Sequence, residues 1–294
     1  MKRFILTFAA ILGFVLTSGA QTVKSFDFKD FEALDISHWF DVEVVRGNTY
    51  SIVVTISEDI EKYLLVKNSK GTLIIGLDNP SKRVLRNEDK IAKATITMPV
   101  LNKLTLSGAS KFNTSDRFDS GKNRFVMKLS GASLVYGLDV TAKDAQITIS
   151  GASTVRELKG DFANADIKVS GASKIYAKIN ADELDVEISG ASKGEVEGEF
   201  EEVDLECSGA SKAILSGMAD KAIIEGSGVC SIVADNMSAK DVKIDLSGAA
   251  KAHVYVTRRL DVECSGASSC TYKTDKSISI TSEISRGSSL RRVD

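Results

Sequence analysis

The chain has 294 residues, of which 43% are hydrophobic and 27% charged, and its 38 Lys and Arg nearly balance its 40 Asp and Glu. This composition is typical of a folded domain, and the formal net charge of −2 gives no electrostatic basis for binding nucleic acid. Gly is common and Pro is rare, 22 against 2, which excludes collagen-like and proline-rich chains.

The first residues have the pattern of a secretory leader. Two basic residues precede an apolar run over residues 4–16, and small residues follow over 18–20. This order predicts a signal peptide over 1–20 with cleavage before Gln21. The apolar run is too short for a membrane span and no second run follows, so the mature chain is predicted to have no membrane span. We expect an exported protein that acts in the periplasm, on the outer surface or as a secreted protein.

Residues 21–106 are predicted to form an irregular β-rich section. The segments WFDVEVV and YSIVVTI alternate apolar and polar residues, as strands with one buried face do. Ser57 is expected to cap a short helix in SEDIEKYLLV, and NSKG before TLIIGL predicts a hairpin turn. Trp39, beside His38, is expected to plug the apolar end of the fold rather than to stack on a sugar.

From residue 107 onward the sequence repeats. Nine of its Ser-Gly pairs recur at nearly equal intervals, and Ala follows the Gly in eight of these nine copies. The nine glycines are Gly108, Gly131, Gly151, Gly171, Gly190, Gly209, Gly228, Gly248 and Gly266. A period of about 20 residues that is maintained over nine copies predicts a solenoid, with an altered tenth copy around Gly287.

Each repeat also carries a strand pattern before its glycine. The residues two, four and six positions before it are nearly all apolar, as Ile188, Val186 and Leu184 are before Gly190. The spacing of leucine-rich repeats and the calcium-binding nonapeptide are absent, so the pattern predicts an all-β protein, a parallel β-helix of nine to ten coils stacked about 4.8 Å apart. The section over 21–106 is expected to start or cap this solenoid over 107–294 as one continuous domain, because a solenoid has an open strand edge at each end.

The repeated SGAS segment is predicted to be a stack of tight corners. Gly adopts backbone angles that other residues avoid, Ala adds little volume, and Ser can hydrogen-bond to the backbone. We therefore assign the nine glycines to structural turns. The only two histidines, His38 and His253, lie far apart in the sequence, so no catalytic residue is predicted.

The order FEALDISHWFDVEVVRG, GTLIIGL, ATITMPVLNKLTLSGAS and then the SGAS coils resembles the head GIN domain family of auto-transporter adhesins from Bacteroidetes-type bacteria. The resemblance extends over nearly all of residues 25–285. It implies a right-handed, single-stranded β-helix and an adhesin role at the cell surface. It brings no catalytic residues with it.

The four cysteines lie in the repeat region. Cys207 and Cys264 share an inward position but are three coils apart, and Cys230 and Cys270 are two coils apart at different positions. Both pairs are too distant for a disulfide, which predicts buried apolar side chains. The even number of cysteines in an exported chain leaves disulfide formation open.

Two charged columns are predicted on the outside of the coils. Three residues before the glycine, the later coils carry Glu187, Glu206, Glu225, Asp245 and Glu263; three residues after it, five coils carry Lys111, Lys174, Lys193, Lys212 and Lys251. Both columns fit solvated faces that keep the rod soluble. Stacked carboxylates repel one another and oxygen-rich sites favour hard divalent cations, so Glu187, Glu206 and Glu225 also form a hypothetical Ca²⁺ site.

Two classes of function remain open. The favoured one is an exported, non-catalytic adhesin or binding module whose long face meets a cell-envelope or extracellular glycan or protein. The alternative is a polysaccharide-degrading lyase or hydrolase, since such enzymes also use parallel β-helices. Coils as short as these leave little length for the long loops that build a catalytic groove.

Overall fold

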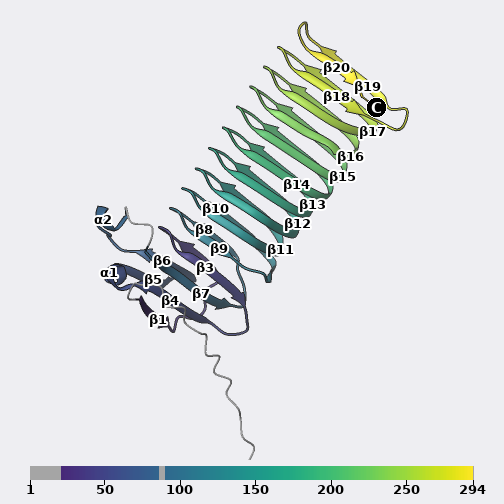
Figure 1. Cartoon of the computed structure of the whole chain (residues 1–294). Helices are drawn as coiled ribbons and strands as arrows, with labels where there is room; N and C mark the ends of the chain where they lie inside the picture. The colour runs from purple at the N-terminus through teal and green to yellow at the C-terminus, as the bar shows by residue number, and fades with distance from the viewer. Residues whose placement is uncertain (1–20, 86–89, 294) are drawn as a thin grey trace, which may run out of the picture.

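The computed structural model describes residues 21–85 and 90–293, so the predicted signal peptide over 1–20 lies outside the described residues. Strands dominate this part of the chain, and they stack into a β-solenoid of about ten turns with an irregular section at its N-terminal end (Figure 1). The prediction of an all-β solenoid of nine to ten coils is confirmed. In the described ranges, no helix is long and apolar enough to cross a membrane.

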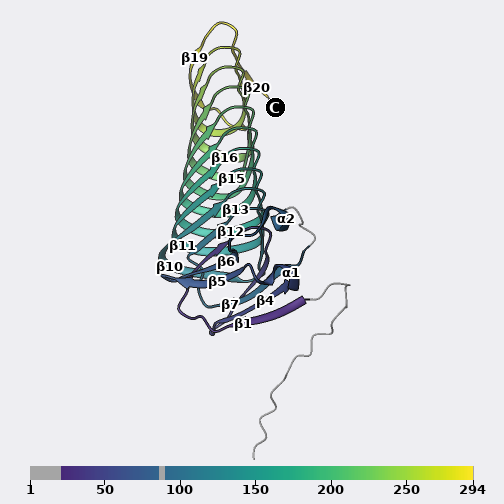
Figure 2. The same cartoon turned by 90° about the vertical axis from the view of Figure 1, so that its left-hand side faces the viewer.

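The N-terminal section contains short strands and two four-residue helices. Its elements are β1 (Gln21–Phe26), β2 (Ala33–Ile36), β3 (Asp41–Arg46), β4 (Ser51–Ser57), α1 (Glu58–Glu61), β5 (Leu64–Ser69), β6 (Thr72–Leu77), α2 (Lys82–Leu85), β7 (Ala92–Met98), β8 (Lys103–Leu106) and β9 (Lys111–Asn113). β4 pairs antiparallel with β1 and β7, and β5 pairs antiparallel with β6 through the hairpin turn at Lys70 and Gly71. These strands lie at the base of the stack, where they cover its first coil (Figure 2).

One detail of this section differs from the sequence-based expectation. Ser57 stands at the N-cap position of α1, but its side chain makes no capping hydrogen bond and its Oγ instead accepts one from the Ile91 N–H at 2.9 Å. The solenoid starts within this section, before the first SGAS segment. β2 pairs in parallel with β6 and β8, and β3 with β7 and β9, so residues 33–46 already form a coil.

The corner of this first coil is Ser37–His38–Trp39–Phe40 instead of SGAS. His38 has φ +72°, the left-handed conformation that favours glycine, and its carbonyl lies directly under Gly108. The Trp39 side chain is half-buried against the core and donates a hydrogen bond from Nε1 to the Lys90 carbonyl at 3.0 Å. Trp39 therefore packs against the core at the corner of the first coil.

The remaining coils repeat with small changes in length. They comprise β10 (Arg117–Leu129), β11 (Leu134–Ile149), β12 (Thr154–Val169), β13 (Lys174–Ile188), β14 (Lys193–Cys207), β15 (Lys212–Gly226), β16 (Ser231–Leu246), β17 (Lys251–Cys264), β18 (Ser269–Lys273), β19 (Ser279–Ile284) and β20 (Ser289–Arg292). From β10 to β17 each strand pairs in parallel with the next. We call the part of a strand that follows the SGAS turn its leading face, residues 193–197 in β14, and the part before the next turn its trailing face, residues 203–207.

The SGAS turns lie over one another. Their nine glycines have φ between +69° and +76°. A Cβ added to any of them would lie 2.3 to 2.9 Å from the carbonyl oxygen of the corner residue in the preceding coil. That oxygen accepts a hydrogen bond from the residue after the glycine, as Gly131 O does from Ala152 N at 2.7 Å. The altered tenth corner is present at residues 285–288, where Gly287 has φ +96°.

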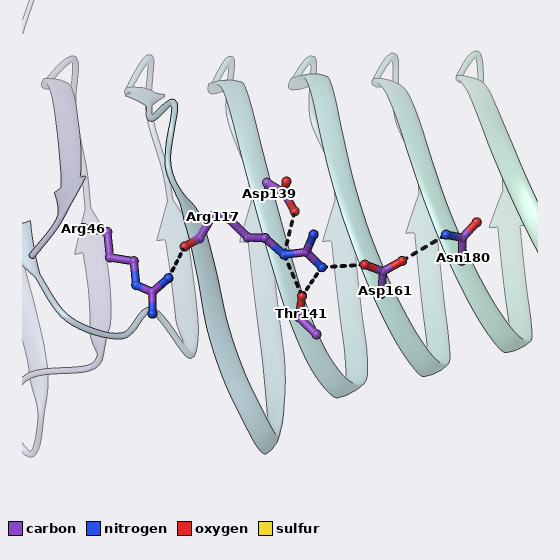
Figure 3. A network of polar contacts seen from close by, with 6 residues as sticks. All are labelled: Arg46, Arg117, Asp139, Thr141, Asp161 and Asn180. Atoms are coloured by element: carbon purple, nitrogen blue, oxygen red, sulfur yellow. Dashed lines mark hydrogen bonds and ion pairs between the residues drawn. The ribbon is translucent and has the colours of Figure 1, made fainter.

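A polar network on the outside ties the N-terminal section to the coils (Figure 3). Arg46 donates from Nη1 to the Arg117 carbonyl at 3.0 Å, and Arg117 donates in turn to Thr141 Oγ1 from Nε at 3.0 Å and to Asp161 Oδ2 from Nη2 at 2.5 Å. Asn180 donates to Asp161 Oδ1 at 2.9 Å. These hydrogen bonds from Asn180 and Arg117 lower the pKa of Asp161. The network joins β3, β10, β11, β12 and β13.

Candidate functional site

A groove with a cavity volume of about 290 Å³ lies across the leading faces of four neighbouring coils, β12 to β15. Tyr176, Glu195 and Ile214 occupy the same outward position in three of these coils and pair directly with one another in the sheet. Glu157 contributes to one wall, and Glu197 to the lining further along the leading face. The groove therefore places an aromatic ring, a carboxylate and an aliphatic side chain in one line along the rod.

A change in coil length accompanies the groove. The register between β12 and β13 shifts between Val155 and Leu158, because β12 has one more residue on its leading face. Glu157 at this bulge has φ +56°, and Gly137 in the preceding coil has φ +66°. A bulge of this kind changes the path of a strand and redirects its side chains, and bulges are common next to binding sites. Glu157 holds a conformation that is unfavourable for a residue with a side chain.

The polar groups around the groove are paired with one another. Lys178 Nζ lies 2.8 Å from Glu197 Oε1, and Lys193 forms an ion pair with Glu195. Lys193 Nζ also lies 5.4 Å from the centre of the Tyr176 ring, a cation–π distance. The hydrogen bond with Glu195 raises the pKa of Lys193. These contacts fix the rim of the groove, whereas the half-buried Tyr176 ring remains partly open to solvent.

One further aromatic side chain lies one coil away from the groove, toward the N-terminal end. Tyr136 is 44% exposed and pairs in the sheet with Arg156, next to the bulge. Its hydroxyl lies 3.4 Å from Glu157 Oε1. An exposed Tyr that is held by a neighbour offers apolar contact area at a small cost in side-chain entropy.

The acidic column predicted from the sequence forms on the trailing faces. Sheet pairing places Glu187, Glu206, Glu225, Asp245 and Glu263 in one line. Lys168, which was not predicted to belong to this column, stands in the same line one coil earlier, where its Nζ lies 3.1 Å from Glu187 Oε2. Burial and the nearby Asp185 raise the pKa of Asp204, which lies beside this column. Lys168 thus partly neutralises the charge of the column at one end, whereas the carboxylates in its middle repel one another.

Of the predicted metal ligands, Glu187, Glu206 and Glu225 are brought into one column but not around one point. Within residues 21–85 and 90–293, no three His, Cys, Asp or Glu side chains converge closely enough to hold a metal ion. Ca²⁺ binding at these three residues stays a prediction. It would require side chains to move toward one another.

Removing one charge from the middle of this column should stabilise the protein. Glu206→Gln relieves repulsion from the glutamates above and below it, and we expect the thermal midpoint to rise by about 1 °C at low salt. Glu187→Gln is the matched control, because it also removes the ion pair with Lys168 and should give a smaller rise or a loss. In thermal melts, added NaCl should reduce the difference in thermal midpoint between Glu206→Gln and the unmodified protein. If Ca²⁺ raises the midpoint of the unmodified protein more than NaCl does at equal ionic strength, the column contains a specific cation site.

The four cysteines are buried and free, as expected. One neighbouring pair of thiols was not predicted from the sequence. Cys207 lies beside Cys230 of the next coil and 3.2 Å from the Ser211 hydroxyl, and hydrogen bonds with these two groups lower the pKa of the Cys207 thiol. Cys230 occupies the corner position that is Ser211 in the coil before it, and Gly226 opposite Cys207 leaves room for the second thiol.

Comparison with known proteins identifies relatives of this fold. A family model described as "Putative auto-transporter adhesin, head GIN domain" matches residues 30–197 and 176–275 of the chain. No curated protein matches the sequence. The solved structure of a "putative adhesin" from Parabacteroides distasonis ATCC 8503 is 14% identical, with a TM-score of 0.54 over 94% of this chain and 98% of that one. A second, from Parabacteroides merdae ATCC 43184, is 15% identical with a TM-score of 0.54 over the same shares. At these identities the likeness shows a shared fold.

Proposed function

Because the chain belongs to the head GIN domain family of auto-transporter adhesins, we propose that it is an exported, non-catalytic adhesin that binds a cell-envelope or extracellular glycan in the groove around Tyr176. An adhesin acts at the cell surface or outside the cell, in agreement with the leader predicted over residues 1–20. The solenoid is a rigid support for such a site, because each coil is fixed by hydrogen bonds to the coils on both sides.

The line formed by Tyr176, Glu195 and Ile214 carries this proposal. A sugar ring has an apolar face of C–H groups and an edge of hydroxyl groups. The Tyr ring and the Ile side chain can pack against the apolar face, and the paired Glu and Lys side chains on the rim can hydrogen-bond to the hydroxyls. The groove runs along the rod over four coils, which suits an extended saccharide better than a compact small molecule.

The same contacts argue against a polysaccharide-degrading enzyme. A glycoside hydrolase needs two carboxyl groups that are free to act on the scissile bond. Glu195 and Glu197 are already ion-paired with Lys193 and Lys178. The arrangement favours hydrogen bonding to a ligand over catalysis.

Tyr176→Ala should weaken glycan binding at least about tenfold, equivalent to ~1.4 kcal/mol, because it removes the aromatic surface at the centre of the groove. Tyr255→Ala is the matched control: Tyr255 is also half-buried on a leading face, with Lys273 Nζ 5.7 Å from its ring centre, but it lies outside the groove. Binding of both variants and the unmodified protein is measured against a panel of neutral, amino-bearing and acidic oligosaccharides.

The same panel decides between the two classes of function. Release of new reducing ends or of unsaturated sugars would support the enzyme instead. If the folded, unmodified protein binds no saccharide, or if both tyrosine variants bind equally well, the groove is not a glycan site.

A further inference from the structure

The last coil of the described chain contains β19 and β20 and lies at the far end of the stack from the N-terminal section (Figure 1). Within the described residues, β19 pairs only with β17 and β20 only with β18. Ile280 and Ile284 are 41% and 38% exposed, although their partners in the preceding coil, Leu260 and Cys264, are 0% and 2% exposed. The two isoleucines occupy core positions, and they are exposed because residues 21–85 and 90–293 contain no further coil that covers them.

The two ends of the rod differ in this respect. At the N-terminal end, β6 and β7 pair with β2 and β3 of the first coil and cover it, and β4 and β1 extend the sheet beyond β7 in antiparallel pairing. At the C-terminal end, the outer edges of β19 and β20 present backbone N–H and C=O groups that have no strand partner in the described chain. A free edge next to exposed core residues is a template for pairing with another strand.

The end coil is complementary to a second copy of itself. β19 runs into the turn at residues 285–288 and β20 runs out of it. A two-fold rotation about an axis through this turn therefore places β19 of one copy antiparallel to β20 of the other, and the reverse pairing follows by symmetry. Glu283 lies on β19, and Arg291 and Arg292 lie on β20, so each pairing sets a strand with an acidic residue beside a strand with basic residues.

We propose that two copies associate tail to tail through β19 and β20, with Ile280, Ile284 and Leu290 closing a core between them. The contact is only one coil wide, so the dimer is reversible rather than permanent. The resulting rod has twice the length and carries two copies of every lateral surface, including the groove around Tyr176. Two linked sites on one rod raise the apparent affinity for a repetitive surface without any new contact. The dimer itself does not depend on the proposed glycan binding.

Sedimentation or light scattering of the purified protein over a range of concentrations tests the proposal. We expect the mass to rise toward twice that of the monomer and to stop there. Ile284→Asp should abolish this rise without lowering the thermal midpoint, since the side chain is already exposed in the monomer. Val229→Asp is the control, because Val229 is 70% exposed at a corner on the side of the rod and should leave the dimer intact.

A charge reversal gives a second, independent test. Glu283→Arg and the double variant Arg291→Glu with Arg292→Glu should each be monomeric alone, because like charges then meet in both pairings. Mixing the two variants should restore the doubled mass, since the mixed dimer has opposite charges in both pairings. A mass that stays monomeric at all concentrations, a mass that grows beyond two copies, or a dimer unaffected by Ile284→Asp and by the reversals would overturn the proposal.

Discussion

Replacing Gly151 with Ala should destabilise the protein by about 3 kcal/mol or more, the largest effect we expect from a single methyl group. Gly151 has φ +75°, and an added Cβ would lie 2.4 Å from Gly131 O and 2.9 Å from Gly131 N in the coil below. Both contacts are with backbone, which cannot move aside without breaking the hydrogen bond from Ala152 to Gly131 O. Denaturant unfolding of the variant and of the unmodified protein measures the loss.

Gly121→Ala separates the cost of backbone strain from the cost of the clash with the coil below. Gly121 also has a positive φ, +58°, but an added Cβ there would meet nothing within 4 Å. This variant should lose only the cost of backbone strain, about 1–2 kcal/mol. If the two variants lose the same stability, the stacking of the corners contributes nothing and the glycines are required only for their backbone angles.

Deleting one whole coil, residues 190–208, should leave a folded and shorter rod. The deletion joins Ser189 to Gly209 and recreates an SGAS corner, and β13 and β15 then stack in the register that each had with β14. Because each coil contacts mainly its neighbours, the remaining coils keep their contacts. Circular dichroism should retain the β signal per residue, and a cooperative thermal transition should remain at a somewhat lower temperature. Loss of both would contradict the view that the coils are interchangeable units.

Much of this fold could be predicted from the sequence because its repeat has a simple physical cause. Glycine is needed wherever a corner lies on another corner, and inward positions alternate with outward ones in every strand. The first coil escaped this reasoning because its corner contains no glycine. His38 adopts the same positive φ under the constraint of the coil above it. The residue types in a Ser-His-Trp segment do not predict that conformation.

The groove could not be predicted from the sequence for a different reason. Tyr176, Glu195 and Ile214 lie one full coil apart from each other, and along the sequence each is one outward residue among polar neighbours. All three stand five residues after their glycine, and this position, unlike those three residues before and after it, shows no repeated charge that would mark it as a column. The interval from Gly171 to Gly190 is shorter by one position than the interval from Gly151 to Gly171, which was a visible signal of the bulge at Glu157.

The central claim is that a stack of interchangeable coils presents a binding groove at one place along its length. Glycan binding by two coil deletions tests it most directly. Deletion of residues 190–208 removes Glu195 and Glu197 from the groove, whereas deletion of 228–247 removes a coil outside it and joins Ser227 to Gly248. We predict that both variants fold, that the 228–247 deletion binds the saccharide as the unmodified protein does, and that the 190–208 deletion binds it at least about tenfold more weakly. Equal binding by the two folded variants would contradict the claim.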